Sequence, residues 1–245
     1  KSEALDPGLL SGSGEAGEPL AFDLTADGVG GAAEVHGTLK QGELAATLQP
    51  SKLRLEDKRL ELRPLVLDVY EGRITANGVA DFKPGEDGAA DASSIKLAVN
   101  ARGLRWRSAD GDTEIGGDAD LGVAGKPDSW ALKGQARLQR GDERATVDLT
   151  GRGDTVGMHI DSLRAAMPQG RLDGNGDLAW SPQLKWDVDA TLAGFDPGYF
   201  APDWPGAVNG RIASHGELRE PGGLLAHVDA RELGGSLRKR PLSGR

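Results

Sequence analysis

A glycine-framed phrase with alternating side chains recurs along this chain and restricts the folds that it can adopt. The phrase has the pattern G-R-h-x-x-[N/H]-G, where h is aliphatic, and it occurs at Gly72–Gly78, Gly170–Gly176 and Gly210–Gly216. A looser copy without the arginine spans Gly31–Gly37. Repetition of one short unit is typical of folds that stack a supersecondary structure, in which function lies along an extended surface. The phrase therefore predicts a functional surface rather than a catalytic cleft.

Apolar and polar side chains alternate through most of the chain, with the period of two that indicates β-strands. Runs with this period include Ile74–Phe82, Trp130–Leu138 and Leu184–Leu192. A phase slip at Gly103 predicts a bulge or a turn, and the charged triplet Glu56–Lys58 predicts a turn. Almost no segment has a helical period. The pattern predicts an all-β protein of about fifteen short antiparallel strands with negligible helix.

The segments between these runs indicate how the chain is organised. Residues 1–18 are rich in Gly, Ser, Pro and Glu, and they predict a flexible leader or loop. Residues 19–245 predict one continuous repetitive β segment. The alternative is a subdivision near residues 83–94 and at the Pro-rich connection 195–206. The chain starts without a methionine or a signal-peptide pattern, stops in mid-pattern and contains no run of ~20 apolar residues. We therefore expect an internal piece of a longer protein, so that any anchor would lie outside this chain.

Charge and cysteine content exclude several classes of function. The net charge of −9 disfavours nucleic acid as a partner, because nucleic-acid binders concentrate Lys and Arg. The chain has no cysteine, which excludes thiol catalysis, cysteine-ligated zinc and disulfide bonds. A cysteine-free β protein is also well suited to an oxidising periplasm.

Residues that could carry chemistry are few and scattered. The segment Asp110–Glu114 spaces three carboxylates as a calcium loop does, but Ile115 and Leu121 stand where that loop needs Gly and Glu, so we interpret it as a solvated turn. Histidines also occur in isolation, at His36, His159, His215 and His227. No nucleophile elbow, phosphate loop or HExxH pattern is present. We expect no enzyme activity, no catalytic or metal site and no cofactor.

The apolar positions of the strands form the main candidate site. Hydrophobic residues make up only 38% of the chain and aromatic residues 4%, so the interior that these positions enclose is predicted to be thin. Two interpretations remain open: the apolar face is an ordinary core, or it lines an open groove. The candidate lining residues are Ile74, Ala76, Phe82, Ile95, Leu97, Val99, Trp130, Leu132, Leu172, Leu178, Trp186, Val188, Ile212 and Val228.

Aromatic residues gather in the Pro-rich connection between residues 195 and 206. Phe195, Tyr199, Phe200 and Trp204 lie within ten residues of one another. One hypothesis is a docking element or a cap over the groove. The alternative is a loop that its own aromatic side chains hold in place.

Two phrases near the end of the chain resemble the TamB family of Gram-negative bacteria. The first is Leu192-Ala-Gly-Phe-Asp-Pro-Gly-Tyr-Phe-Ala-Pro-Asp-Trp-Pro-Gly206, which leads into the glycine phrase that ends at Gly216. The second is Leu233-Gly-Gly-Ser-Leu-Arg-Lys-Arg-Pro-Leu-Ser-Gly-Arg245, in which Lys239 stands where the family pattern has glycine. The upstream glycine-framed strands are similar in style to AsmA-like proteins in general.

This resemblance implies an elongated curled sheet, a β-taco or U-shaped groove with an apolar interior. It implies a periplasmic segment of an inner-membrane-anchored protein that works with the outer-membrane barrel protein TamA. Phospholipid acyl chains are the expected cargo, passing between inner and outer membranes. The alternative is a scaffold that pairs its strand edges with TamA or with outer-membrane protein clients during assembly. A surface adhesin with a filled core is a third hypothesis.

Overall fold

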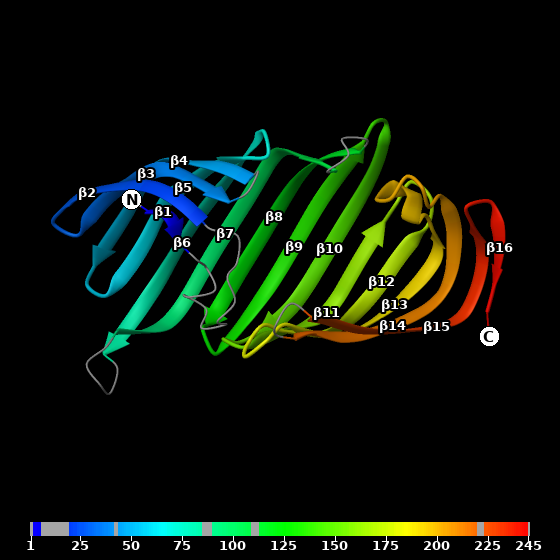
Figure 1. Ribbon diagram of the computed structural model, residues 1–245. Helices are drawn as coiled ribbons and strands as arrows, with labels where there is room; N and C mark the ends of the chain where they lie inside the picture. The colour runs from blue at the N-terminus through cyan, green and yellow to red at the C-terminus, as the bar shows by residue number, and fades with distance from the viewer. Residues whose placement is uncertain are drawn as a thin grey trace. The chain divides into compact units, whose positions relative to one another are not determined.

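The protein is built almost entirely of β-strands, as a computed structural model shows (Figure 1). The structure describes residues 2–5, 20–41, 44–84, 90–108, 113–219 and 223–244. Its strands are β1 (Ser2–Leu5), β2 (Leu20–Val29), β3 (Ala32–Gln41), β4 (Leu44–Glu56), β5 (Arg59–Val69), β6 (Gly72–Pro84), β7 (Ala90–Arg107), β8 (Glu114–Lys126), β9 (Ser129–Arg140), β10 (Glu143–Gly153), β11 (Gly157–Ala166), β12 (Arg171–Ala179), β13 (Lys185–Phe195), β14 (Gly206–Arg219), β15 (Gly223–Leu237) and β16 (Arg240–Ser243). One short 3-10 helix, η1 (Pro197–Tyr199), lies between β13 and β14.

Strand order follows the sequence from β1 to β16, and each strand is hydrogen-bonded to the next. The sheet is not closed, and the antiparallel all-β fold class predicted from the alternation is confirmed. The chain divides into two compact units. Unit 1 comprises Lys1–Arg105 and Asp120–Pro127, and unit 2 comprises Trp106–Ala119 and Asp128–Arg245.

The start of the chain differs from the predicted leader. Ser2–Leu5 form β1, in which Ser2 pairs with Phe22 and Leu5 with Leu20. Without β1, the edge of β2 would present unpaired backbone N–H and C=O groups. A neighbouring segment can form hydrogen bonds with these groups whatever its composition. The remainder of the predicted leader, residues 6–19, lies outside the described residues.

The predicted turns fall mostly where the sequence places them. Asp57 and Lys58 both have positive φ, at 46° and 67°, and they connect β4 to β5. Gly103, at φ 63°, lies within β7 at the predicted phase slip. The loop expected near residues 83–94 is shorter than its composition indicates. Strands β6 and β7 extend into it, with Phe82 paired to Ala92 and Pro84 to Ala90.

The glycine-framed phrases fall in four strands, β3, β6, β12 and β14. Each final glycine lies inside a strand between two apolar cross-strand neighbours, as Gly78 lies between Leu62 and Leu97. Gly176 lies in the same way between Ile160 and Val188. Along each phrase, the side chains on the apolar face of the strand therefore decrease in size, from an aliphatic residue to the final glycine.

Unit 1 has few buried apolar side chains among its described residues: Leu48, Val69 and Ala101. Ser51 is 1% exposed and sits at an irregularity of β4. Its hydroxyl donates to the carbonyl oxygen of Gln49 at 2.7 Å and accepts from the N–H of Val66 at 2.9 Å. These bonds satisfy backbone groups that the irregular pairing leaves without strand partners.

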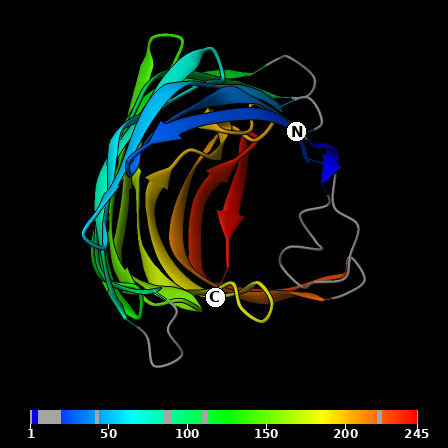
Figure 2. The ribbon, with the colours of Figure 1, turned by 90° about the vertical axis from the view of Figure 1, so that its left-hand side faces the viewer.

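Unit 2 bows so that its β12–β16 strands present a concave face (Figure 2). Its buried apolar side chains among the described residues are Ala145, Met167, Leu192, Tyr199 and Val208. Three of these, Ala145, Met167 and Tyr199, pack together with Leu138 and Phe195 at one end of the strands. The rest of the concave face has no such buried cluster among the described residues.

Candidate functional site

The strand register of unit 2 places its apolar side chains on a single face. Directly paired residues of antiparallel strands project to the same side of a sheet. One row of such pairs runs from β9 to β15 through Leu132, Gly151, Ile160, Gly176, Val188, Ser214 and Val228. The same register places the other predicted lining residues of this unit beside the row: Trp130, Leu172, Leu178, Trp186 and Ile212.

This apolar face of unit 2 is furrowed because large and small side chains alternate across the strands. Gly151 and Gly176 separate the aliphatic residues Leu132, Ile160 and Val188. A Cβ atom added at Gly176 would lie 2.2 Å from the carbonyl oxygen of Asp187, so the backbone leaves no space for one. The glycines therefore allow close approach of the strands and leave shallow gaps between the large side chains.

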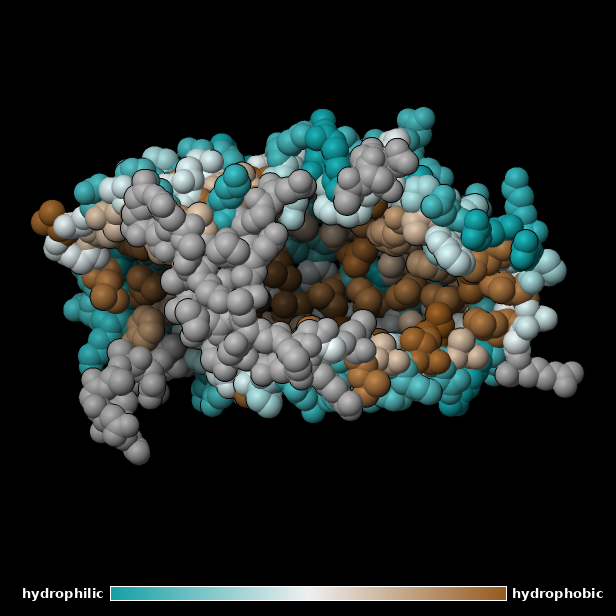
Figure 3. Space-filling model, viewed as in Figure 1, coloured by the Kyte–Doolittle hydropathy of each residue, from teal (hydrophilic) through white to brown (hydrophobic). Residues whose placement is uncertain are grey.

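The described part of the chain supplies no second layer over most of this face. Leu132, Trp186 and Val188 remain partly exposed, and Val228 is 61% exposed. Figure 3 shows apolar side chains gathered in a hollow over the strands of unit 2, between hydrophilic margins. A filled core, which the adhesin hypothesis requires, is not found among the described residues. A contiguous exposed apolar area of this kind is typical of surfaces that bind a partner or a ligand.

Three tryptophans lie at one end of the strands of unit 2, and we name this place the tryptophan end: Trp130, Trp180 and Trp186. The Trp130 ring lies over Gly153 and the Trp186 ring over Gly216, both directly opposite on the neighbouring strand. The rings of Trp130 and Trp180 are stacked, with centroids 6.2 Å apart. Sequence reasoning predicted Trp130 and Trp186 as lining residues but missed Trp180.

Each of these indoles also makes a polar contact. Their Nε1 atoms donate to the carbonyl oxygens of Asp154 and Thr155 and to the hydroxyl of Ser214, each at 3.0 Å. The signal that could have identified this arrangement is the pairing of a tryptophan with a glycine on the next strand. That pairing becomes visible only when the register is known.

The Pro-rich connection covers the opposite end of the apolar face of unit 2, and we name it the capped end (residues 196–205). Tyr199, 2% exposed, packs against the cluster that includes Ala145 and Met167. Arg140 of β9 donates to the carbonyl oxygens of Gly198 at 2.5 Å and Tyr199 at 3.1 Å. The connection thereby reaches back to strands that precede it by more than fifty residues.

The four aromatic residues predicted in this connection do not act as one group. Phe195 and Tyr199 enter the buried cluster, whereas Phe200 and Trp204 are 43% and 48% exposed. Tyr199 and Phe200 meet edge to face, and the Arg238 guanidinium lies 5.2 Å from the centroid of Trp204. Burial raises the pKa of the Tyr199 phenol, and the nearby Glu143 carboxylate raises it further, while Arg140 lowers it.

The end of β13 is fixed by a carboxylate. Asp196 accepts hydrogen bonds from the N–H groups of Gly198 at 2.9 Å and Gly206 at 2.8 Å. The side-chain oxygen of Asn209 accepts from the N–H of Gly194 at 2.8 Å. These bonds hold both stems of the connection and position η1 over the capped end.

Unit 1 has its own apolar face, formed by the same register rule. Ile74 and Ala76 pair with Ala101 and Val99, and Gly78 pairs with Leu97. Ile95 and Phe82 continue the face along β6 and β7. A hollow of about 190 Å³ opens beside Gly78, and it is lined by Leu60, Leu62, Gly78, Val79, Ala80, Ile95, Lys96, Leu97 and Val123.

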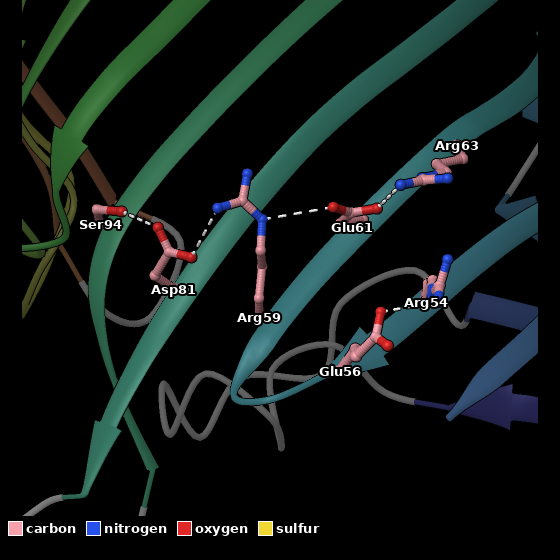
Figure 4. Close-up of polar contacts among 7 residues, drawn as sticks. All are labelled: Arg54, Glu56, Arg59, Glu61, Arg63, Asp81 and Ser94. Carbon is pink, nitrogen blue, oxygen red and sulfur yellow. Dashed lines mark hydrogen bonds and ion pairs between the residues drawn. The ribbon is translucent and has the colours of Figure 1, made fainter. Parts of the chain in front are cut away.

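The opposite face of each unit is polar. In unit 1, Arg59 bridges Glu61 at 3.4 Å and Asp81 at 3.3 Å, and Ser94 donates to Asp81 at 2.8 Å (Figure 4). The arginines of the glycine phrases lie on this side. Arg73 donates to Asp68 at 2.6 Å, and this hydrogen bond holds the pKa of the Asp68 carboxyl below its ordinary value.

Further ion pairs lie on the polar face of unit 1. Arg54 pairs with Glu56 at 2.8 Å, and Arg63 pairs with Glu61 (Figure 4). Exposed pairs of this kind contribute little stability individually. Their effect is to keep one side of the sheet in water and thereby to define the other side as the apolar one.

Three of the histidines, those of unit 2, also lie on the polar face. Cross-strand pairing aligns His159, Asp177, Asp187, His215 and His227 in one row of unit 2. The rings of His215 and His227 are in contact, with centroids 4.9 Å apart. No group of three or more potential ligands that could hold a metal ion occurs in the described residues. Residues 109–112 of the acidic turn lie outside them.

Comparison with known proteins identifies one family. Residues 70–245 match the family model described as TamB, N-terminal domain. No solved structure matches the chain. Within the part of the chain that the structure describes, no helix has the length and apolar character that a membrane span requires.

Proposed function

Because this chain belongs to the TamB family, whose members are transport or assembly modules that work with TamA in outer-membrane assembly, we propose that it carries phospholipid. In this proposal the chain is a periplasmic segment, and acyl chains lie against its apolar face on their way between the inner and outer membranes. The absence of cysteine suits that oxidising compartment.

The observation that supports this proposal is an apolar face that the described residues leave largely uncovered. In unit 2 the side chains of the row from Leu132 to Val228 remain at least partly exposed, although the row crosses seven strands and its two glycines are buried. Removing an acyl chain from water stabilises the complex by ~0.8 kcal/mol per methylene. The transfer needs no covalent step, and its direction must come from a gradient or from partners at either end.

The first experiment is organic extraction of the purified chain followed by mass spectrometry, with a protein of similar size as control. The proposal predicts phospholipid in stoichiometric amount. A chain that is folded and free of lipid would contradict it.

A charged substitution on the apolar face of unit 2 tests which face holds the lipid. Val188→Asp places a carboxylate among apolar neighbours. A charge in a hydrocarbon environment costs ~3 kcal/mol, so lipid binding should become about 100-fold weaker. Thr191→Asp, on the polar face of the same strand, is the matched control and should retain lipid. Equal lipid content in a folded Val188→Asp variant would count against the proposal.

An open strand edge favours the scaffold as a second candidate. Only Gly234–Leu237 of the long strand β15 pair with β16. Among the described residues, Gly223–Glu232 have no strand on that side, so their backbone groups are available for β-augmentation by TamA or by a client strand. A proline within Gly223–Glu232 should then abolish partner capture, while Val188→Asp should not. The reverse result would favour lipid transfer.

A further inference from the structure

The two ends of the strands in unit 2 differ in chemistry, and the difference bears on how a lipid would lie. At the capped end, residues 196–205 join β13 to β14. At the tryptophan end, residues 154–156 join β10 to β11 and residues 180–184 join β12 to β13. Any molecule on the apolar face lies between these two boundaries.

The capped end closes the apolar face with the chain's own residues. Tyr199, Met167 and Ala145 are each less than one-tenth exposed and pack together. Arg140 fixes this arrangement through two backbone carbonyls. Inserting a hydrated headgroup here would require opening a buried cluster.

The tryptophan end presents an interface between apolar and polar surroundings. The indole rings lie on the apolar face, while their N–H groups reach oxygen atoms at the margin. Trp180 is 41% exposed. An indole is both apolar and polar, and tryptophans accumulate where a hydrocarbon region meets water, at the level of lipid headgroups and their ester groups.

Two carboxylates at the tryptophan end have local partners. The Asp154 carboxylate accepts from the N–H groups of Val156 at 2.8 Å and Gly157 at 3.0 Å. Glu217 has the Lys185 ammonium 3.5 Å away. These two carboxylates are therefore poor sources of repulsion for a phosphate, which matches a zwitterionic headgroup.

The distance between the two ends is long enough to hold the acyl chains of one bilayer leaflet. Trp186 and Leu192 mark the apolar stretch of β13, and six residue steps of ~3.3 Å span about 20 Å. Half of a hydrocarbon core about 30 Å thick is about 15 Å. An extended acyl chain therefore fits along the strands between the tryptophan end and the capped end.

We propose that unit 2 orients phospholipid, with the ester region at Trp130, Trp180 and Trp186 and the acyl chains directed toward the capped end. This orientation rests on the proposed lipid-carrying function and adds to it the direction in which each lipid lies. Trp186 and Trp130 are positioning residues, because they locate the boundary between headgroup and acyl chain.

Tryptophan fluorescence with brominated phosphatidylcholine tests the orientation. The full chain is loaded with lipid that carries bromine either near the ester end or near the methyl end of its acyl chains. One variant keeps only Trp186 and another keeps only Trp204, with phenylalanine at the other tryptophans. Trp186 should lose more emission to ester-end bromine than to methyl-end bromine. Trp204, in the capped end, should lose less emission than Trp186 to ester-end bromine.

The outcomes separate this inference from the function on which it depends. Equal quenching of Trp186 by both lipids, or stronger quenching by methyl-end bromine, overturns the orientation and leaves lipid binding intact. Absence of all quenching, together with lipid-free extracts, overturns the lipid-carrying function. If a variant with one tryptophan loses the wild-type circular dichroism spectrum, single replacements are used. Trp186→Phe should then remove more of the ester-end quenching than Trp204→Phe.

Discussion

Single glycines decide how closely the strands of this sheet approach. At Gly216, an added Cβ would lie 2.3 Å from Cζ2 of Trp186, because the indole ring covers the glycine. At Gly78, it would lie 2.8 Å from the carbonyl oxygen of Lys96. At such positions the absent side chain is itself a structural feature, because a neighbour occupies the space.

Gly216→Ala should destabilise the chain and move the Trp186 ring. Overpacking of this kind costs about 1–3 kcal/mol. Urea unfolding gives the free energy, and Trp186 emission reports the displacement of the ring. The control is Gly234→Ala in β15, where nothing lies within 4 Å of an added Cβ, and its effect should stay within about 0.5 kcal/mol. Equal effects of the two substitutions would contradict this account.

At the scale of elements, the connection between β13 and β14 is ordered although residues 200–205 within it are exposed. Its order comes from Asp196, which caps both stems, and from Tyr199, which enters the buried cluster. The Tyr199 hydroxyl is buried with no hydrogen-bond partner among the described residues. The aromatic ring therefore supplies the stabilisation, and the hydroxyl opposes it.

Tyr199→Ala should cost about 3–5 kcal/mol, because it leaves a cavity in the buried cluster. Tyr199→Phe keeps the ring and removes the unpaired hydroxyl, so we expect unchanged or slightly higher stability. The measurement is chemical unfolding followed by circular dichroism. A substantial loss in Tyr199→Phe would show instead that the hydroxyl has a partner.

Alkaline pH should weaken the same element. The tyrosine pKa is about 10 in an unfolded chain, and burial raises the pKa of Tyr199 in the folded chain. The folded state then retains a proton that the unfolded state releases. The stability due to Tyr199 is fully present below about pH 10 and falls as the pH rises toward the folded pKa. Between about pH 9 and about pH 11, wild type should lose more stability than Tyr199→Phe. Identical losses would contradict the assignment.

At the scale of the whole chain, many strands share few buried side chains. The buried apolar residues among those described are Leu48, Val69, Ala101, Ala145, Met167, Leu192, Tyr199 and Val208. Because hydrophobic burial is the main favourable term in folding, a chain with so few buried residues gains unusually from any molecule that covers its apolar faces.

Delipidation should therefore lower the melting temperature, and adding phospholipid should restore it. A ligand at 100 times its Kd adds about 2.7 kcal/mol to the stability of the state that binds it. Differential scanning calorimetry of delipidated and reloaded chain measures the change, with Val188→Asp as the variant that should respond less. A melting temperature independent of lipid would argue that the faces are covered by protein.

Local sequence determined the strands, most of their turns and which side chains share a face, because alternation is a property of neighbouring residues. The face that joins Leu132 to Val188 follows from that alternation once register is added. Sequence also identified the family, through the phrases around Gly206 and Pro241. The sequence predicted a longer loop at residues 83–94 than the structure has, because backbone pairing continues through residues of loop composition.

Only the tertiary structure decided what lies opposite what. Strand bulges shift the register, so the pairing of Trp186 with Gly216 could not be counted from the sequence. The contact of Arg140 with Gly198 joins residues far apart in the chain, and it depends on how the intervening strands bow. Whether an apolar face is covered is likewise a non-local property. The sequence thus determined an apolar face, and the packing of distant segments determined that the described residues of unit 2 cover this face at one end and leave most of the rest uncovered.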